Sequence, residues 1–373
     1  MGIKDLLKIF RPVARKINLS KYKGKKIAID SFVILHKYAI NWAKEVVEEN
    51  SKNLINSCLN AIESWVSLGI IPVMVFDGRE LPMKKKTNQN REKKRSEALK
   101  NAIQATKEGD HKKARSEYIK AISITPKIVH NFIEELQKKK IEVIVAPYEA
   151  DAQLTYLYLN NYCSAVLTID SDLLVYGVEN CIFDCDKDGN GYEMSWKDIY
   201  KVNQDGNLNQ LENQLENLNL NENENENENE KNSSTKIIFD FSGWTYEMFL
   251  KMVILSGCDY LKSIKGIGLK RAFNLVSKFE KMEKIYQEIE KKKQIPLDYK
   301  TNFQNAFLTF LHQRVYDPIK KEMVFLRPFD PKLELDLDVS KLKNSNFLGE
   351  FLKSEIVEGI AKGKLNPRTL KEF

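Results

Sequence analysis

Seven carboxylates in this chain have the spacing that a site for divalent cations needs. They are Asp30, Asp77, Glu149, Asp151, Asp170, Asp172 and Asp259. Asp30, Asp77 and Asp170 each end a short apolar run, with the sequences KIAID, IPVMVFD and SAVLTID. Such runs are typical of buried parallel strands, and residues at the carboxyl ends of parallel strands line the usual ligand crevice of an open α/β sheet.

Two more of these acids lie where a helix should begin. Glu149 and Asp151 follow the apolar run EVIVAP and fall in the first turn after Pro147, where the helix dipole favours anions. Each acid alone is equally consistent with a turn or a helix cap. Together they would place uncompensated negative charge at one sheet edge, which is costly unless divalent cations bind there.

This acid set predicts a metal-dependent nuclease. Hydrolysis of a phosphodiester needs a hydroxide near neutral pH and stabilisation of the leaving oxygen, and two Mg²⁺ ions roughly 4 Å apart supply both. Because Mg²⁺ keeps several waters and uses few carboxylates, a surplus of acids shared between two ions is expected.

A basic segment complements the acids. The net charge of the chain is +7, and residues 84–115 contain twelve Lys or Arg against four Asp or Glu. This stretch has helix-forming composition without a continuous apolar stripe, so we expect it to project from the core as a basic helical arch over residues 83–125. Lys84 and Arg91 are about two helical turns apart and should share a face, from which they could reach the phosphate that the metals hold. A solvated helix face is the plainer alternative, but the acids nearby favour a polyanionic partner.

The rest of the pattern predicts an α/β fold with a mostly parallel sheet. Helical and strand-like stretches alternate over residues 1–202, with strands expected at 142–146 and 164–170 and helices at 126–140 and 148–160. Residues 181–196 predict a hairpin. Its Asp184, Asp186 and Asp188 resemble the start of an EF-hand loop, but position twelve is Ser195 rather than Glu. Residues 203–235 predict a disordered low-complexity insertion, residues 236–325 a helical region, and residues 326–373 an irregular tail packed on the core.

A glycine-containing loop, SIKGIGLKR at residues 263–271, lies between two expected helices. Glycines let backbone N–H groups approach phosphates, and the N-terminus of the following helix adds its dipole. The loop follows Asp259 closely, which links it to the acid set and makes a phosphate contact a sharper prediction than the G-x-G spacing alone.

Composition limits the compartment. No run of 18 apolar residues suggests a membrane span, and the N-terminus MGIKDLLKIF lacks a signal-peptide core. The five cysteines include no C-x-x-C pair, so buried free thiols in the cytosol or nucleus are expected.

Several of these segments together resemble a known family, the structure-specific 5′ nucleases that include flap endonuclease and exonuclease 1. The similar segments are MGIKDLL, IAID, VFDG, APYEADAQL, TIDSDLL and LSGCDYLKSIKGIGLKRA, in the family's order and over residues 1 to about 325. The segments YKGKKIAIDSF, LHKYAI and VYDPIKK, and Asp rather than Glu at position 151, are similar to the exonuclease 1 branch.

The resemblance implies a PIN-like nuclease core and assigns roles to residues. All seven acids would bind two Mg²⁺ ions, with Lys84 and Arg91 assisting from the arch. Residues 263–268 would form a helix–two-turn–helix element that grips duplex DNA and holds K⁺ near Ser256, Ser263 and Ile267. DNA contacts are implied at Gly2, Phe32, His36, Lys84, Arg91, Lys265, Gly266, Gly268 and Lys270. Phe32 could stack on a base, although a core role is equally consistent with its sequence context.

The expected function is a monomeric, nuclear, Mg²⁺-dependent 5′→3′ exonuclease of duplex DNA with recessed 5′ ends, nicks or flaps. By resemblance it would act in mismatch repair and recombination and would also cut 5′ flaps. A replication flap endonuclease, a non-catalytic DNA-junction binder and a metal-dependent ribonuclease stay open as alternatives. Residues 326–373 contain no sliding-clamp peptide of the Gln-x-x-Leu-x-x-Phe-Phe pattern, so the sequence predicts no particular protein partner.

Overall fold

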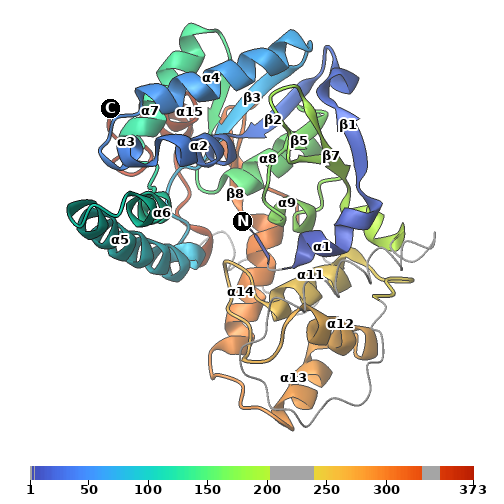
Figure 1. The fold of residues 1–373 in the computed structure, drawn as a ribbon. Helices are drawn as coiled ribbons and strands as arrows, with labels where there is room; N and C mark the ends of the chain where they lie inside the picture. The colour runs from blue at the N-terminus through green and yellow to red at the C-terminus, as the bar shows by residue number, and fades with distance from the viewer. Residues whose placement is uncertain (1, 4, 202–238, 330–344) are drawn as a thin grey trace.

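Seven strands form the central sheet of the computed structural model, which describes residues 2–3, 5–201, 239–329 and 345–373 (Figure 1). The strand order is β1-β7-β6-β5-β2-β3-β4. The bounds are β1 (Arg15–Asn18), β2 (Lys26–Asp30), β3 (Ile71–Phe76), β4 (Glu142–Val145), β5 (Ala165–Leu167), β6 (Cys181–Phe183) and β7 (Asn190–Met194). Strands β6, β5, β2, β3 and β4 run parallel, while β7 pairs antiparallel with β1 and β6. The predicted mostly parallel sheet is confirmed, as is the hairpin in place of an EF-hand.

The strand register brings several chain segments out at one edge of the sheet. Asp30 lies opposite Val75, and Phe76 lies opposite Val145, so β2, β3 and β4 end nearly level. The apolar residues of β2, and those of β3 after Ile71, are buried because helices cover the sheet. The prediction that Asp170 ends its strand is wrong. Strand β5 stops at Leu167, since Thr168 Oγ1 accepts a hydrogen bond from the Asp170 N–H (3.0 Å) and turns the chain.

Several helices of the N-terminal half surround the sheet or pack on the helices that cover it. They are α1 (Leu6–Phe10), α2 (Ser31–Ala39), α3 (Ala43–Val47), α4 (Lys52–Ser67), α7 (Pro126–Lys138), α8 (Ala150–Leu159) and α9 (Asp172–Val175). Helices α2 and α4 contact each other and β3, α7 contacts β4, and α8 contacts β2, β3 and β5. Thr125 caps α7 through its hydroxyl, with Pro126 at the first helical position, as the sequence pattern favours.

Two long helices form the basic arch. Helix α5 (Lys85–Lys107) packs along α6 (His111–Ala121), and the pair extends away from the sheet (Figure 1). The expectation that this segment lacks an apolar stripe needs correction. Ala98, Ala102 and Ala105 are buried on one side of α5, where their small side chains let α6 approach closely. This narrow alanine stripe is hard to recognise among so many charged residues.

The second half of the chain is helical and then returns to the core. Its helices are α11 (Tyr246–Ser256), α12 (Leu269–Lys278), α13 (Met282–Glu290) and α14 (Tyr299–His312). The chain continues as a hairpin of β8 (Arg314–Asp317) and β9 (Glu322–Phe325) and then α15 (Ser354–Ala361), which contacts β4, β8 and β9. The hairpin departs from the helical pattern expected over residues 236–325, and the irregular tail expected over residues 326–373 is wrong for residues 354–361, which form α15. The insertion predicted at 203–235 lies outside the described residues.

Candidate active site

Elements far apart in sequence deliver the seven acids, which we call the carboxylate cluster, to one edge of the sheet. Asp30 is the last residue of β2, Asp77 follows β3, and Glu149 is the N-cap of α8 rather than part of its first turn as predicted. Asp170 and Asp172 follow β5, and Asp259 comes from the loop after α11. The fold thus joins the predicted acids through sheet topology and through the packing of the helical region.

Backbone hydrogen bonds fix the first two acids. Asp30 Oδ1 accepts from the N–H groups of Phe32 (3.0 Å) and Val33 (3.3 Å), which makes Asp30 the cap of α2. Asp77 Oδ1 accepts from the Ala150 N–H at 2.7 Å and so connects the end of β3 to the start of α8. These carboxylates therefore have defined orientations while each keeps an oxygen for other partners.

The segment from Asp170 to Asp172 lies against the N-terminus of the chain, as Figure 1 shows near α9. Asp170 Oδ1 accepts from the Asp172 N–H at 3.0 Å, and Ser171 Oγ accepts from the Ile3 N–H at 2.9 Å. Gly2 has φ +88°, and a Cβ there would lie 2.3 Å from Asp170 Oδ1. Only glycine therefore fits between the N-terminal segment and these acids.

The cluster carries more negative charge than its surroundings compensate. Asp30, Glu149, Asp151 and Asp172 are all buried. Burial, with the charges of Asp77 and Asp170, raises the pKa of Asp30 to about 7. Burial and then the charge of Asp170 raise the pKa values of Asp151 and Asp172 well above the ordinary range for Asp. Within the described residues Asp172 Oδ1 is buried without a hydrogen-bond partner, so it is a carboxylate oxygen available to a ligand.

The arch supplies the cations nearest to the acids. Lys84 Nζ forms ion pairs with Glu149 and, at 3.2 Å, with Asp259. Arg91 binds both carboxylate oxygens of Asp259 at 2.9 Å. Burial opposes the charge of Lys84, but Glu149 and Asp259 outweigh it and raise the pKa of Lys84. Lys84 lies in the turn before α5 rather than in the helix, but both cations bind Asp259 and so lie on the same side, as their spacing predicts.

Carboxylates are a type of ligand that divalent cations prefer, but contacts with the arch hold these side chains in their present arrangement. Among the residues that the structure describes, no three Asp, Glu, His or Cys side chains stand together ready to share an ion. Lys84 and Arg91 occupy oxygens of Glu149 and Asp259, and like charges separate when no cation lies between them. The donor set of carboxylates, with a free buried oxygen at Asp172, still fits Mg²⁺ after side-chain movement.

The predicted potassium residues lie around the turn between α11 and α12. Gly257, directly after Ser256, has φ +102°, and a Cβ there would lie 3.1 Å from the Ser263 nitrogen. Ile267 is buried, whereas Lys265, Gly266, Gly268 and Lys270 are exposed. The loop therefore folds Ser263 back against Gly257 and presents backbone and lysines to solvent.

Phe32 and His36 line the side of α2 that approaches the arch. Both side chains are half-buried, and their ring centroids lie 6.4 Å apart. Burial, followed by the charges of Arg95 and Arg91, lowers the pKa of His36 to about 4. His36 is therefore neutral near pH 7 in a strongly positive neighbourhood.

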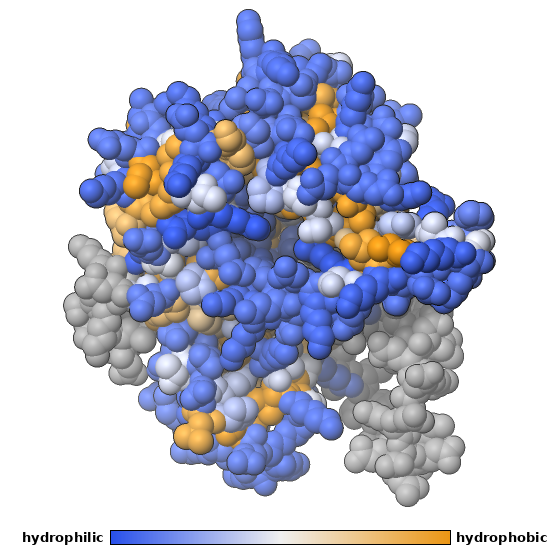
Figure 2. Space-filling view, turned by 90° about the vertical axis from the view of Figure 1, so that its left-hand side faces the viewer, coloured by the Kyte–Doolittle hydropathy of each residue, from blue (hydrophilic) through white to orange (hydrophobic). Residues whose placement is uncertain are grey.

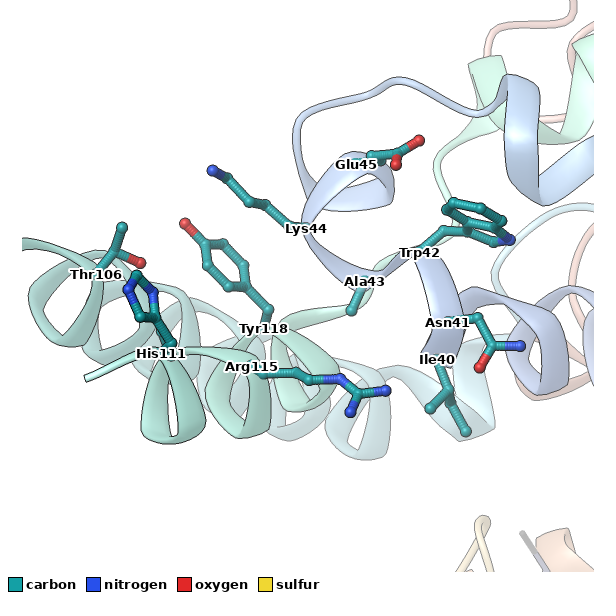
Figure 3. A pocket seen from close by; sticks show the side chains of 11 residues that line it. Ile40, Asn41, Trp42, Ala43, Lys44, Glu45, Thr106, His111, Arg115 and Tyr118 are labelled. Atoms are coloured by element: carbon teal, nitrogen blue, oxygen red, sulfur yellow. The ribbon is translucent and has the colours of Figure 1, made fainter. Parts of the chain in front are cut away.

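A cavity of about 290 Å³ lies elsewhere, between α3 and the arch (Figure 3). Its lining includes Trp42, Lys44, His111, Arg115 and Tyr118, and the side chains of Lys44 and Tyr118 extend in the same direction. None of the seven acids lines it, so this cavity is separate from the carboxylate cluster. Figure 2 shows a largely hydrophilic face in which apolar side chains form separate patches.

Sequence reasoning missed neutral residues that hold the acids. Thr168 Oγ1 donates to Asp30 Oδ2 at 3.3 Å and accepts from the Asp170 N–H. Thr87 Oγ1 donates to the Asp259 carbonyl at 2.8 Å, which ties the arch to the loop after α11. A polar Thr ending an apolar strand was a usable signal for the first, but the Thr87 contact depends on packing between distant segments.

Two family models match the chain, the XPG N-terminal domain over residues 1–98 and the XPG I-region over residues 140–259. Exonuclease 1 of Arabidopsis thaliana is 33% identical over 375 residues, which cover 100% of this chain and 45% of that protein. The chain thus spans less than half of that relative.

Solved structures share the fold. The catalytic core of Rad2 in complex with DNA substrate gives a TM-score of 0.55 at 16% identity, over 96% of this chain and 98% of that one. The Holliday junction-resolving enzyme GEN1 with product DNA, Mg²⁺ and Mn²⁺ gives 0.52 at 17% identity, over 86% and 66%. The two XPG models together match more than half of the 373 residues, and they agree with the similarity to exonuclease 1 over the whole of this chain. This chain belongs to the XPG and flap endonuclease family, and within it to the exonuclease 1 group.

Proposed function

We propose that the chain is a Mg²⁺-dependent 5′→3′ exonuclease of duplex DNA that also cuts 5′ flaps and acts in nuclear DNA repair. One observation carries this proposal. The buried acids are under-compensated, and the cations nearest to them come from the basic arch. Such a site suits metal ions together with a phosphate, because each ion neutralises acids and each arch cation can then move to the phosphate.

The residues that would hold Mg²⁺ are the seven acids of the carboxylate cluster, and the GEN1 structure with Mg²⁺ and Mn²⁺ supports divalent ions in this fold. Bound ions would supply a hydroxide near neutral pH and stabilise the charge on the leaving oxygen. The unpartnered oxygen of Asp172 and the raised pKa values of Asp151 and Asp172 are the features of this chain that favour cations there.

The remaining residues position the substrate. Backbone N–H groups hold Oδ1 of Asp30 and Oδ1 of Asp77, so the second oxygen of each carboxylate would keep a fixed direction toward a bound ion. Lys84 and Arg91 would leave Glu149 and Asp259 for the scissile phosphate and neutralise charge in the transition state. Gly2 packs closely against Asp170 and would keep the N-terminal segment beside these acids when DNA binds.

DNA away from the cut would bind the loop between α11 and α12. Lys265 and Lys270 are exposed there, and Gly268 begins α12, whose N-terminal N–H groups favour a phosphate. K⁺ near Ser256, Ser263 and Ile267 would strengthen the same contact. On the other side of the acids, half-buried Phe32 could stack on the terminal base while His36 packs beside it.

The test uses a 3′-labelled duplex with a recessed 5′ end, incubated with Mg²⁺ in the presence or absence of excess EDTA. Wild type should produce a ladder of shortened labelled products, and both EDTA and Asp172→Asn should abolish it. Asp188→Asn is the matched control, because Asp188 is an exposed acid in the β6–β7 turn.

Other outcomes would identify the alternatives. Intact DNA that is still bound in a gel shift would indicate a non-catalytic binder, and cleavage of a matched RNA duplex alone would indicate a ribonuclease. A strong preference for double-flap DNA over recessed ends would replace the exonuclease with a flap endonuclease.

A further inference from the structure

The start of strand β8 contacts three elements that each carry acids of the carboxylate cluster. Residues 313–317 follow α14 and lie beyond residue 259, where the second family match ends. The first of these elements is α8, which begins after Glu149 and contains Asp151. The second is the segment after Asp172, and the third is the loop at Asp259. A short strand that is distant in sequence therefore supports the cluster from behind.

Gln313 makes the central contacts. Its side-chain amide donates to Tyr176 Oη at 2.6 Å and to Tyr260 Oη at 3.0 Å, and the two hydroxyls are 2.7 Å apart. All three side chains are buried. Tyr176 lies one helical turn beyond Asp172, and Tyr260 directly follows Asp259. One amide thus connects the two segments that carry these acids.

The same strand is fixed to α8 by a second glutamine. Gln153 Oε1 accepts from the Tyr316 N–H at 2.7 Å, and Gln153 Nε2 donates to the Tyr316 carbonyl at 2.8 Å. This two-point contact imitates a pairing between neighbouring strands, so it sets the register of β8 against α8. Gln153 is fully buried two residues after Asp151. Tyr156 adds a bond from its hydroxyl to Asp317 Oδ2 at 2.9 Å.

Neutral side chains are suited to holding the acid-bearing segments together. The acids repel one another, so their backbones need support that does not depend on a charge inside the cluster. A lysine or arginine at position 313 would compete with metal ions for the carboxylates, whereas an amide and two hydroxyls bind strongly without net charge. Rings also hold the tyrosines in place, since Phe310 packs against Tyr176 at 5.1 Å and against Tyr260 at 4.9 Å between centroids.

We propose that Gln313 is a positioning residue of the active site, joining the Asp172 and Asp259 segments through Tyr176 and Tyr260 so that their carboxylates can share cations. This inference rests on the proposed metal-dependent function. Gln313 does not touch substrate in this role. Its loss should therefore weaken metal binding and lower kcat while the KM for DNA stays nearly constant.

The experiment compares wild type with Gln313→Met, which keeps the side-chain length and removes its polar atoms. Mn²⁺ affinity is measured without DNA by electron paramagnetic resonance, and kcat and KM are measured on the recessed duplex. We expect Mn²⁺ affinity and kcat to fall about 10–100-fold, the range seen when groups that orient metal ligands are removed. KM should change less than about two-fold if substrate contacts are intact.

A second variant and a control separate positioning from folding. Tyr260→Phe removes one oxygen and keeps the ring contact with Phe310, so it should fold and give a smaller loss of the same kind. Combined with Gln313→Met it should add little, because both changes break one network. Tyr22→Phe is the control, since Tyr22 bonds to Glu193 at the far edge of the sheet. It should lower thermal stability and leave Mn²⁺ affinity unchanged.

Two results would overturn the inference alone: Mn²⁺ affinity and kcat equal to wild type in Gln313→Met and Tyr260→Phe, or losses that merely follow stability and also occur in Tyr22→Phe. If Gln313→Met does not fold, the comparison of Tyr260→Phe with Tyr22→Phe decides the question. A wild-type chain that neither binds Mn²⁺ nor cleaves DNA would overturn the proposed function and this inference with it.

Discussion

Two groups of buried carboxylates lie at different places on the sheet, and their surroundings compensate the negative charge of one group but not of the other. Glu193, on β7, is 3% exposed, and Asp172 in the carboxylate cluster is 4% exposed. Glu193 accepts from Tyr22 Oη (2.6 Å), from Lys21 Nζ (2.7 Å) and from Arg15. Asp172 has a buried oxygen without any hydrogen-bond partner among the described residues. Burial alone therefore does not distinguish a structural acid from a functional one.

The difference is visible in the pKa values. Burial raises the pKa of Glu193, but the hydrogen bonds from Lys21 and Tyr22 outweigh it, so the net pKa is lowered. In the carboxylate cluster burial is joined by like charges, and the pKa values of Asp151 and Asp172 are raised. We call Arg15, Lys21, Tyr22, Glu193 and Asp198 the far-edge network. It compensates its own charge, whereas the carboxylate cluster leaves charge for ligands.

The largest expected effect is on activity and contrasts one substitution from each group. Asp172→Asn should lower the cleavage rate by roughly 10³-fold, because a cation ligand is lost where charge develops in the transition state. It should also leave thermal stability equal or higher, since a buried like charge is removed. Glu193→Gln should do the reverse, with normal cleavage per folded molecule and lower stability. Rate and melting temperature measured on both variants test the contrast, and a fall of activity in both would remove it.

The next effect is stabilisation by metal. If Mg²⁺ binds the folded cluster and not the unfolded chain, saturation at about 100 times Kd should stabilise the protein by about 2.7 kcal/mol. Wild type and Glu193→Gln should both show the resulting rise in melting temperature with increasing Mg²⁺. Asp172→Asn should show much less of it. Equal shifts in all three proteins would mean that the ions bind elsewhere.

The sequence predicted the sheet and the acids at its edge better than it predicted the local geometry around those acids. Apolar runs that end in Asp identify buried parallel strands, and such patterns are local, so Asp30, Asp77 and the sheet could be anticipated. The position of Asp170 could not, because the hydroxyl of Thr168 ends β5 early. The far-edge network also escaped notice, since Tyr22 and Glu193 are 171 residues apart and meet only through sheet pairing.

The arch shows a second limit of sequence patterns. Its charge was evident, yet the stripe of Ala98, Ala102 and Ala105 that joins α5 to α6 carries little hydrophobic signal. Gln313 is a similar case, because a glutamine after an amphipathic helix gives no indication that two tyrosines bind it. Contacts made by small or neutral side chains depend on which distant segments pack together, and that information is spread over the whole fold.

The pH dependence of stability separates the two groups by sign. Asp30→Asn keeps the cap of α2, so it reports mainly on charge. The pKa of Asp30 is about 7 when folded and about 3.9 when unfolded, so wild type gains stability as pH falls from above 7 toward 4. The variant should therefore be more stable than wild type at pH 8, and the two should converge near pH 4. Urea unfolding across this range measures the difference.

Glu193→Gln should behave in the opposite sense. The folded pKa of Glu193 is below its unfolded value, so its contribution is present above about pH 4.3 and is lost as pH falls through the folded pKa. The variant should be less stable than wild type by about 1–3 kcal/mol at pH 7, a range kept low because Lys21 and Arg15 are half-exposed. The stabilities of the variant and of wild type should again become equal at low pH, but here the variant is the less stable protein at higher pH. If Asp30→Asn also approached wild type from below, the cluster acids would be compensated like Glu193, and the case for cations at the sheet edge would lose its physical basis.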